Sequence, residues 1–225
     1  MTYEDTKNIN FDTLKSNLKL GAIHTSGDSE IVINKNAHEL ETLLDVLLLN
    51  TNNNIEEVIS NPNVDVVVEV MGGIEPAYTF VKRALLAGKS VSTSNKALVA
   101  KHGSELMEIA REKNINFLFE ASCGGGIPII RPLNSSLTAD EIDEITGILN
   151  GTTNFILTKM IRDNMPFDVA LKTAQELGYA ERNPSADVDG IDACRKICIL
   201  ASLSFGKHVY PDNIHTEGIT KITPE

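Results

Sequence analysis

The middle of the chain alternates short β-branched runs with longer amphipathic stretches. The run at 64–73 is rich in valine and is bounded by a proline and two glycines, which is typical of a buried strand. Further strands are predicted at 90–94 and 115–122, and the stretches 76–86 and 97–113 between the strands have the pattern of helices. This order of strands and helices predicts parallel βαβαβ units with right-handed crossovers.

The pattern changes after a glycine-rich loop at Cys123–Gly126. Segment 141–151 alternates apolar and polar residues, which predicts a half-exposed strand. Apolar residues recur at the helical period on both sides of this segment. The predicted helices cover 128–137, 155–164, 167–177 and 188–205, with Asp187 as a candidate N-cap of the last one. The second half of the chain is therefore predicted to be α+β.

The composition of the 225 residues argues against several classes of protein. Lysine and arginine number 20 and aspartate and glutamate number 31, and the resulting charge of −11 opposes binding to the phosphate backbone of nucleic acid. The longest apolar run is far too short to cross a bilayer, and the N-terminal residues lack the apolar core of a secretory signal. The three cysteines form no disulfide framework. We therefore expect a cytoplasmic protein with no nucleic-acid or membrane partner.

Three loops follow the predicted strands, at the sheet edge where parallel α/β proteins bind their ligands. These loops are Met71–Gly73, Ser94–Lys96 and Ser122–Gly126. Lys96 stands at the start of a predicted helix, where the helix dipole disfavours a cation, so a functional role is favoured over an ordinary exposed lysine. In the third loop, carbonyl groups of consecutive glycines could converge on Na⁺ or K⁺, although a tight turn is the simpler explanation.

The segment from Gly178 to Lys196 is rich in carboxylates and contains a spaced acid and base. Asp192 and Lys196 are four residues apart on a predicted helix, and the acid precedes the base, which is the better orientation for an ion pair. The pair is either an ordinary surface ion pair or a proton-exchanging lysine that an aspartate holds and tunes. The spacing alone leaves both interpretations open.

A polar junction at Asn150–Asn154 separates the predicted strand from the next helix. Threonine hydroxyls and backbone N–H groups at a helix N-terminus suit a carboxylate ligand. The alternative is that Thr152 or Thr153 serves only as the helix N-cap.

Six segments, taken together and in order, resemble homoserine dehydrogenase. They are VDVVVEVMGGIEPA (64–77), STSNKALVAKHG (92–103), FEASCGGGIPIIRPL (119–133), GILNGTTNFILTKM (147–160), ELGYAERNPSADVDGIDACRKICILASLSFG (176–206) and HTEGITKI (215–222). Several long motifs in the right order are far more specific than a lone glycine fingerprint. The resemblance implies interconversion of L-aspartate 4-semialdehyde and L-homoserine with NADPH or NADH. This step leads to threonine, methionine and isoleucine.

The resemblance also implies roles for the polar residues. Lys196 would exchange the proton with the substrate oxygen, and Asp192 would orient Lys196. Lys96 would contact substrate and cofactor, and it is the competing candidate for proton transfer. The substrate would bind to Glu181, Asp187, Gly151 and Thr152.

Cofactor and cation sites follow from the same resemblance. The implied neighbours of an NADP or NAD cofactor are Met71, Gly72, Thr93, Ser94 and Lys96. A monovalent cation, Na⁺ or K⁺, would be held mainly by the backbone carbonyls of Glu120, Cys123, Gly125 and Ile127. The side chain of Cys123 departs from the small aliphatic residue that is usual there, which backbone ligation tolerates.

The resemblance implies two incomplete domains. Residues 1–127 would form a partial Rossmann-like dinucleotide-binding domain, and residues 128–225 a partial α+β substrate domain through which a homodimer forms. Residues 1–60 contain helix-like stretches at 39–49 and 55–60 but no glycine-rich turn of the kind that cradles a pyrophosphate. The alternative to an active enzyme is therefore a truncated, non-catalytic relic or subunit with weak or no cofactor binding. A related dehydrogenase acting on another small substrate is a further alternative.

Overall fold

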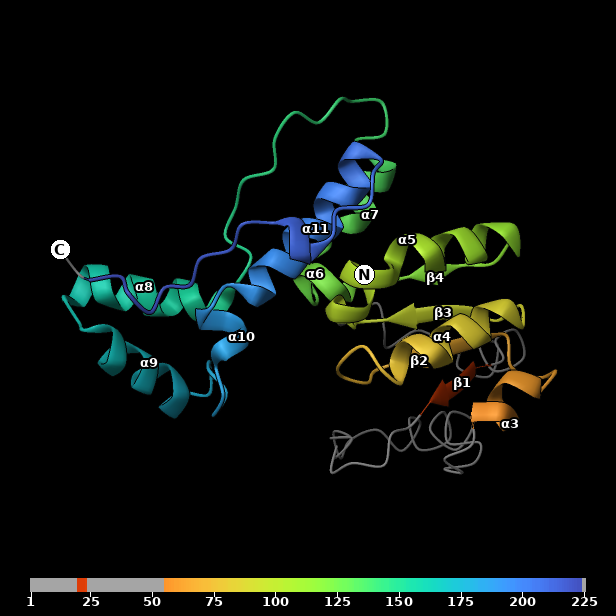
Figure 1. Ribbon diagram of the computed structural model, residues 1–225, viewed down its shortest axis with the longest axis horizontal. Coiled ribbons are helices and arrows are strands. Elements are labelled where there is room, and N and C mark those ends of the chain that lie inside the picture. The colour runs from red at the N-terminus through yellow and green to blue at the C-terminus, as the bar shows by residue number, and fades with distance from the viewer. Residues whose placement is uncertain (1–19, 24–54, 224–225) are drawn as a thin grey trace, which may run out of the picture. The chain divides into compact units, whose positions relative to one another are not determined.

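The computed structural model describes residues 20–23 and 55–223 of the chain (Figure 1). The chain divides into two compact units. Unit 1 comprises the described residues up to Leu98 together with His102–Phe119, and unit 2 comprises Val99–Lys101 and the residues from Glu120 onward. The predicted helix at 39–49 lies outside the described residues. The domain boundary predicted after residue 127 stays a prediction.

Unit 1 is built on a parallel sheet whose strands are adjacent in chain order. The strands are β1 (Leu20–Ile23), β2 (Val66–Glu69), β3 (Ser90–Thr93) and β4 (Phe117–Leu118), and the helices are α3 (Ile55–Ser60), α4 (Ala77–Leu86) and α5 (Lys96–Glu112). Parallel neighbours must be joined by a crossover, and α4 and α5 supply the crossovers from β2 to β3 and from β3 to β4. The predicted parallel βαβαβ arrangement is therefore confirmed.

Glycine and asparagine set the ends of the two crossover helices. Gly88, the predicted residue after the end of α4, has a φ of +81°, a conformation that other residues rarely adopt. Asn95 caps α5, because its side-chain oxygen accepts a hydrogen bond from the backbone N–H of Leu98 at 3.1 Å. Helix α5 consequently begins at Lys96, one residue earlier than predicted.

Strand β4 is shorter than the predicted strand at 115–122. Only Phe117 and Leu118 pair with β3, through Val91 and Ser92. Since β3 itself ends at Thr93, the chain after Leu118 has little strand left to pair with. It turns instead into the short helix α6 (Ala121–Gly124).

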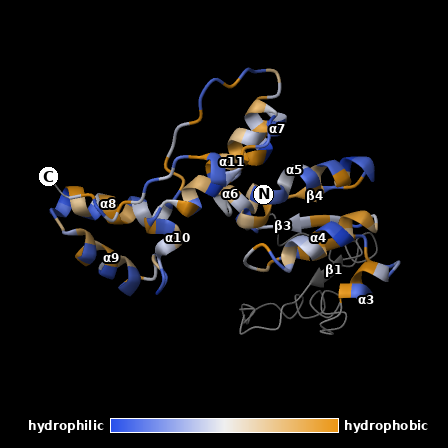
Figure 2. Cartoon of the chain, in the orientation of Figure 1, coloured by the Kyte–Doolittle hydropathy of each residue, from blue (hydrophilic) through white to orange (hydrophobic). Residues whose placement is uncertain are grey.

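Unit 2 is helical in its described part. Its remaining elements are α7 (Ile130–Ser135), α8 (Gly151–Asp163), α9 (Phe167–Glu176), α10 (Ser185–Val188), α11 (Ile191–Phe205) and the 3-10 helix η2 (Pro211–Asn213). A core joins α8, α9 and α10 through Ile156, Met160, Ala170, Ala174 and Val188, all buried. Apolar and polar residues alternate along α8 and α9 with the helical period (Figure 2).

Two predictions for the second half are wrong. Segment 141–150 has no regular secondary structure, and Gly151 opens α8. A strand needs a neighbouring backbone for its hydrogen bonds, and none of the described residues pairs with this segment; Ile148 is 75% exposed. The predicted helix at 188–205 is interrupted at Gly190, whose φ is +81°, so Asp187 lies in α10 and does not cap α11. Among the described residues, no helix is both long and apolar enough to span a membrane.

Candidate functional site

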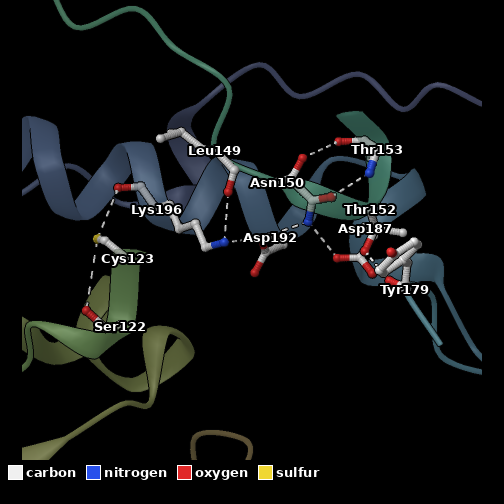
Figure 3. A network of polar contacts seen from close by, with 10 residues as sticks. All are labelled: Ser122, Cys123, Leu149, Asn150, Thr152, Thr153, Tyr179, Asp187, Asp192 and Lys196. Carbon is white, nitrogen blue, oxygen red and sulfur yellow. Dashed lines mark hydrogen bonds and ion pairs between the residues drawn. The ribbon is translucent and has the colours of Figure 1, made fainter. Parts of the chain in front are cut away.

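The Lys196 side chain extends from α11 toward Asp192 and the backbone of Leu149 (Figure 3). Its Nζ lies 2.7 Å from Oδ2 of Asp192, one helical turn earlier, and donates a hydrogen bond to the carbonyl oxygen of Leu149 at 2.8 Å. The two charged side chains are only 15% and 8% exposed. Burial on this scale separates the pair from an ordinary surface ion pair, because removing one partner would leave an uncompensated buried charge.

Asn150 connects this pair to a second carboxylate. Its side-chain Nδ2 donates hydrogen bonds to Oδ2 of Asp192 at 2.9 Å and to Oδ1 of Asp187 at 2.6 Å. Its side-chain oxygen accepts the backbone N–H of Thr153 at 2.8 Å, so Asn150 is also the N-cap of α8. The alternative that Thr152 or Thr153 caps this helix is therefore wrong.

Sequence reasoning missed the role of Asn150. The available signal was the preference of asparagine for helix N-caps, just before Gly151 and Thr152. That signal was outweighed because the strand predicted at 141–151 placed Asn150 inside a strand. The two acceptors of its amino group lie 37 and 42 residues further along the chain, at distances that no local pattern reports.

The other predicted substrate residues surround this network unevenly. Thr152 donates its hydroxyl hydrogen to the carbonyl oxygen of Tyr179 at 2.6 Å, which ties the start of α8 to the turn after α9. Gly151 is exposed, with open space where a side chain would stand. Glu181 is exposed and lies outside the network drawn in Figure 3. The structure thus joins Asp187, Asp192 and Lys196.

In unit 1, the predicted cofactor residues lie in the loop after β2 and in the segment from the end of β3 to the start of α5, and hydrogen bonds join these two segments. Asn95 donates from its side-chain Nδ2 to the carbonyl oxygen of Gly73 at 2.6 Å. Thr93 is buried, and its hydroxyl oxygen accepts the backbone N–H of Asn95 at 2.9 Å. The neighbouring Gly72 and Ser94 are exposed, and a side-chain atom added at Gly72 would meet nothing within 4 Å. A ligand can therefore approach this backbone closely, and the residues fit a bound dinucleotide.

Glu69 lies beneath these loops and was also missed from the sequence. It is fully buried at the end of β2. Burial raises the pKa of its carboxyl above the ordinary value, and hydrogen bonds from Thr93 and Met71 act in the opposite direction. The valine-rich pattern of β2 concealed it, because a carboxylate is rarely expected on the buried face of a strand.

The predicted cation loop is closed by the Glu120 side chain. Both carboxylate oxygens accept backbone N–H groups at the start of α7, from Ile129, Ile130 and Arg131 at 2.6, 2.9 and 2.7 Å. The loop between them contains Gly125, which has a φ of +59° and is exposed. Since the Glu120 side chain is committed to these N–H groups, only its backbone carbonyl fits the cation role implied by the resemblance. Carbonyl oxygens are suitable ligands for a hard cation.

Cys123 contributes a buried thiol next to this loop. Its Sγ lies 3.9 Å from the carbonyl oxygen of Lys196. Burial raises the pKa of the Cys123 thiol, so the thiol stays protonated and is a poor nucleophile. Its backbone remains a candidate cation ligand, while its side chain packs α6 against α11.

Two family models match the chain in succession. The model described as homoserine dehydrogenase, NAD binding domain, matches residues 26–120. The model described as homoserine dehydrogenase matches residues 128–225. The matches thus cover most of the residues in both units.

Relatives and solved structures agree with these models. The homoserine dehydrogenase of Synechocystis sp. is 48% identical over 169 residues, which are 75% of this chain and 39% of that protein. A homoserine dehydrogenase structure from Thiobacillus denitrificans has a TM-score of 0.75 and 45% identity, covering 84% of this chain and 43% of that chain. A hyperthermophilic archaeal homoserine dehydrogenase in complex with NADPH has a TM-score of 0.70 and 35% identity, covering 76% of this chain and 53% of that chain.

The chain thus spans about two fifths of the length of the curated relatives that it matches. Within that span, the order of the two matched models, the level of identity and the fold all point to one family. The chain belongs to the homoserine dehydrogenase family.

Proposed function

We propose that the chain acts as an NAD(P)-dependent oxidoreductase that interconverts L-aspartate 4-semialdehyde and L-homoserine, in the biosynthesis of threonine, methionine and isoleucine. The observation that carries the proposal is the buried Lys196–Asp192 pair, which Asn150 links to Asp187. A buried, held lysine beside further carboxylates suits proton exchange next to an ammonium-bearing substrate. The family supplies the identity of that substrate.

Lys196 is the proposed proton carrier. Of the three hydrogens on its ammonium group, one is directed to Asp192 and one to the carbonyl of Leu149, which leaves one for a substrate oxygen. In the direction of reduction, Nζ gives a proton to the aldehyde oxygen as that oxygen becomes a hydroxyl. In the reverse direction, neutral Nζ takes the hydroxyl proton. The nicotinamide, when bound, supplies or accepts the hydride.

The substrate ammonium group is proposed to bind to Asp187 and Glu181. Asp187 accepts one hydrogen bond from Asn150 through Oδ1, and Oδ2 is the oxygen proposed to meet the ammonium. Thr152 uses its hydrogen on Tyr179, so its hydroxyl oxygen can act only as an acceptor. The acceptor oxygens of Asp187 and Thr152 favour a cationic group over an anionic one, and the exposed Gly151 leaves space beside them.

NADP or NAD is proposed to bind at Met71, Gly72, Thr93, Ser94 and Lys96 in unit 1. A Na⁺ or K⁺ ion is proposed to bind to the backbone carbonyls of Glu120, Cys123, Gly125 and Ile127. The Glu120 carboxylate supports the cation site by fixing the far end of the loop. We further propose a homodimer and a cytoplasmic location, which follow from the family.

The test is the oxidation of homoserine with NADP⁺, followed at the absorption band of reduced nicotinamide. Lys196→Ala should lower kcat by at least about a hundredfold, the usual contribution of a positioned acid–base group. Lys159→Ala is a matched control, because Lys159 forms an exposed i,i+4 ion pair with Asp163. Asp192→Asn should lower kcat less than Lys196→Ala, since it removes an orienting partner and not the proton carrier.

Two outcomes would change the proposal. A wild-type rate in folded Lys196→Ala would transfer the proton role to Lys96 or to water. A folded wild-type chain that neither turns over homoserine nor binds nucleotide would favour the non-catalytic alternative.

A further inference from the structure

Glu69 occupies an unusual place for a carboxylate. It is the last residue of β2, on the same buried face as Val67, and it is 0% exposed. Burying a carboxylate is costly unless hydrogen bonds compensate it, and an apolar residue would pack on this face at lower cost. Its presence therefore calls for an explanation beyond packing.

The two oxygens of Glu69 accept hydrogen bonds from two different segments, the loop after β2 and the end of β3. Oε1 accepts the backbone N–H of Met71 at 2.6 Å, in the loop that follows β2. Oε2 accepts the hydroxyl of Thr93 at 2.5 Å, at the end of β3. The register of the sheet pairs Glu69 with Thr93, so the contact follows directly from the alignment of the two strands.

The hydrogen bonds continue from Thr93 to the start of α5. The Thr93 hydroxyl oxygen accepts the backbone N–H of Asn95, and the Asn95 side chain bonds both the carbonyl of Gly73 and the N–H of Leu98. Glu69 thus lies at the base of a network that fixes the loop after β2, the loop after β3 and the first turn of α5. Lys96 is the first residue of that turn.

We propose that Glu69 is a positioning residue, whose two carboxylate oxygens hold these two loops in the arrangement that binds the nicotinamide nucleotide. The inference rests on the proposed function, because it assigns the nucleotide to these loops. Glu69 acts through Met71 and Thr93 and is not assigned a contact with the nucleotide itself.

The test compares three variants of the full chain. Glu69→Met keeps the length of the side chain and removes both acceptors. Glu69→Gln keeps one acceptor oxygen for the Met71 N–H and places an amino group opposite the Thr93 hydroxyl. Val67→Ala is the matched control, because it weakens the same buried face of β2 without touching the hydrogen bonds.

The first measurement is the Kd for NADPH by fluorescence titration. We expect Glu69→Met to raise Kd by at least about tenfold, and Glu69→Gln and Val67→Ala by less than about threefold. The second measurement is amide hydrogen exchange at Asn95 and Leu98 in the nucleotide-free chain. Exchange should accelerate in Glu69→Met but not in Val67→Ala, even though both variants are less stable than wild type.

The two measurements separate the inference from the function on which it rests. If the wild-type chain binds no nucleotide, the proposed function fails for this chain, and the exchange data alone decide whether Glu69 holds the loops. The inference is overturned if Glu69→Met keeps wild-type exchange at Asn95 and Leu98, or if Val67→Ala accelerates exchange equally. If Glu69→Met does not fold, Thr93→Val breaks the same network from β3. Thr93 is itself a proposed nucleotide contact, so amide hydrogen exchange at Asn95 and Leu98 then decides.

Discussion

A single carboxamide holds two carboxylates together at the residue scale. Asn150 donates one hydrogen to Asp187 and the other to Asp192, while its oxygen caps α8. Both hydrogens of its amino group and its side-chain oxygen are therefore in use. A carboxylate in its place would keep the cap, since aspartate and asparagine cap helices equally well, but it would face two like charges.

Asn150→Asp should therefore destabilise the chain by about 2–4 kcal/mol at neutral pH, through loss of two hydrogen bonds and added repulsion. The deficit should shrink at pH values near 4, where carboxylates begin to take up protons. Urea unfolding at both pH values measures it, and Asn150→Ser, which keeps a cap without a charge, is the control. Equal stability losses in the two variants at neutral pH would contradict the prediction.

Glu69 makes stability depend on pH in the opposite direction from most carboxylates. Burial raises its pKa, so the folded chain holds the proton more tightly than the unfolded chain. The contribution of this proton to stability is complete below the unfolded pKa and is lost as pH rises through the folded pKa.

The glutamine side chain in Glu69→Gln cannot ionise, so this variant does not lose stability as the pH rises through the pKa of Glu69. Relative to wild type, its free energy of unfolding should rise as the pH increases from the ordinary glutamate pKa of 4.5 through the raised pKa of Glu69 in the folded chain. Urea unfolding at intervals across this range measures the difference. A difference between the two proteins that stays constant with pH would show that Glu69 does not titrate as described.

At the element scale, the sequence predicted those elements whose ends are set by residues close to them in the sequence. The β-branched residues of β2, the glycine after α4 and the helical period of α5 are visible in the sequence, and these elements formed at the predicted places. Strand β2 is nevertheless shorter than the predicted strand at 64–73, because only Val66–Glu69 belong to it. Segment 141–150 was mispredicted because alternation reports a preference for one buried face and cannot supply a pairing strand. For the same reason, the spacing of Asp192 and Lys196 predicted their pairing, while the link through Asn150 depends on tertiary structure.

Gly190 and Gly218 let the segment after η2 pack against the turn between α10 and α11. The backbone N–H of Ile219 donates to the carbonyl oxygen of Val188 at 2.8 Å. A side-chain atom added at Gly218 would lie 2.6 Å from the Val188 oxygen and 2.9 Å from the Cα of Asp189. Both are backbone atoms, so the clash cannot be relieved by rotating a side chain.

Gly218→Ala should therefore cost about 1–3 kcal/mol of stability and should also lower homoserine turnover, because the displaced turn lies between Asp187 and Asp192. Gly147→Ala is the control, since an added atom there meets nothing within 4 Å. Thermal unfolding and steady-state kinetics measure the two effects. If both variants behave like wild type, the close approach of the two segments is not required.

At the scale of the whole molecule, each unit buries its own apolar residues. In unit 1 these residues include Val67, Val81, Leu85, Val91 and Leu106. In unit 2 the core of α8, α9 and α10 is centred on Ile156 and Met160, which are 0% and 1% exposed. Separate cores favour separate cooperative units, each of which can lose stability by itself.

Met160→Ala tests this separation. Truncating a fully buried methionine should destabilise unit 2 by about 2–5 kcal/mol, because it loses buried contacts and leaves a cavity. Hydrogen exchange should accelerate in α8 and α9, while the amides of β2 and β3 keep their protection. Ile161→Ala is the control, because Ile161 follows Met160 on the same helix but is 76% exposed. This substitution should change the free energy of unfolding by no more than about 0.5 kcal/mol. Equal loss of protection in the sheet and in α8 would mean that the two units unfold as one. The proposed nucleotide and substrate residues would then be governed by the same free energy of unfolding.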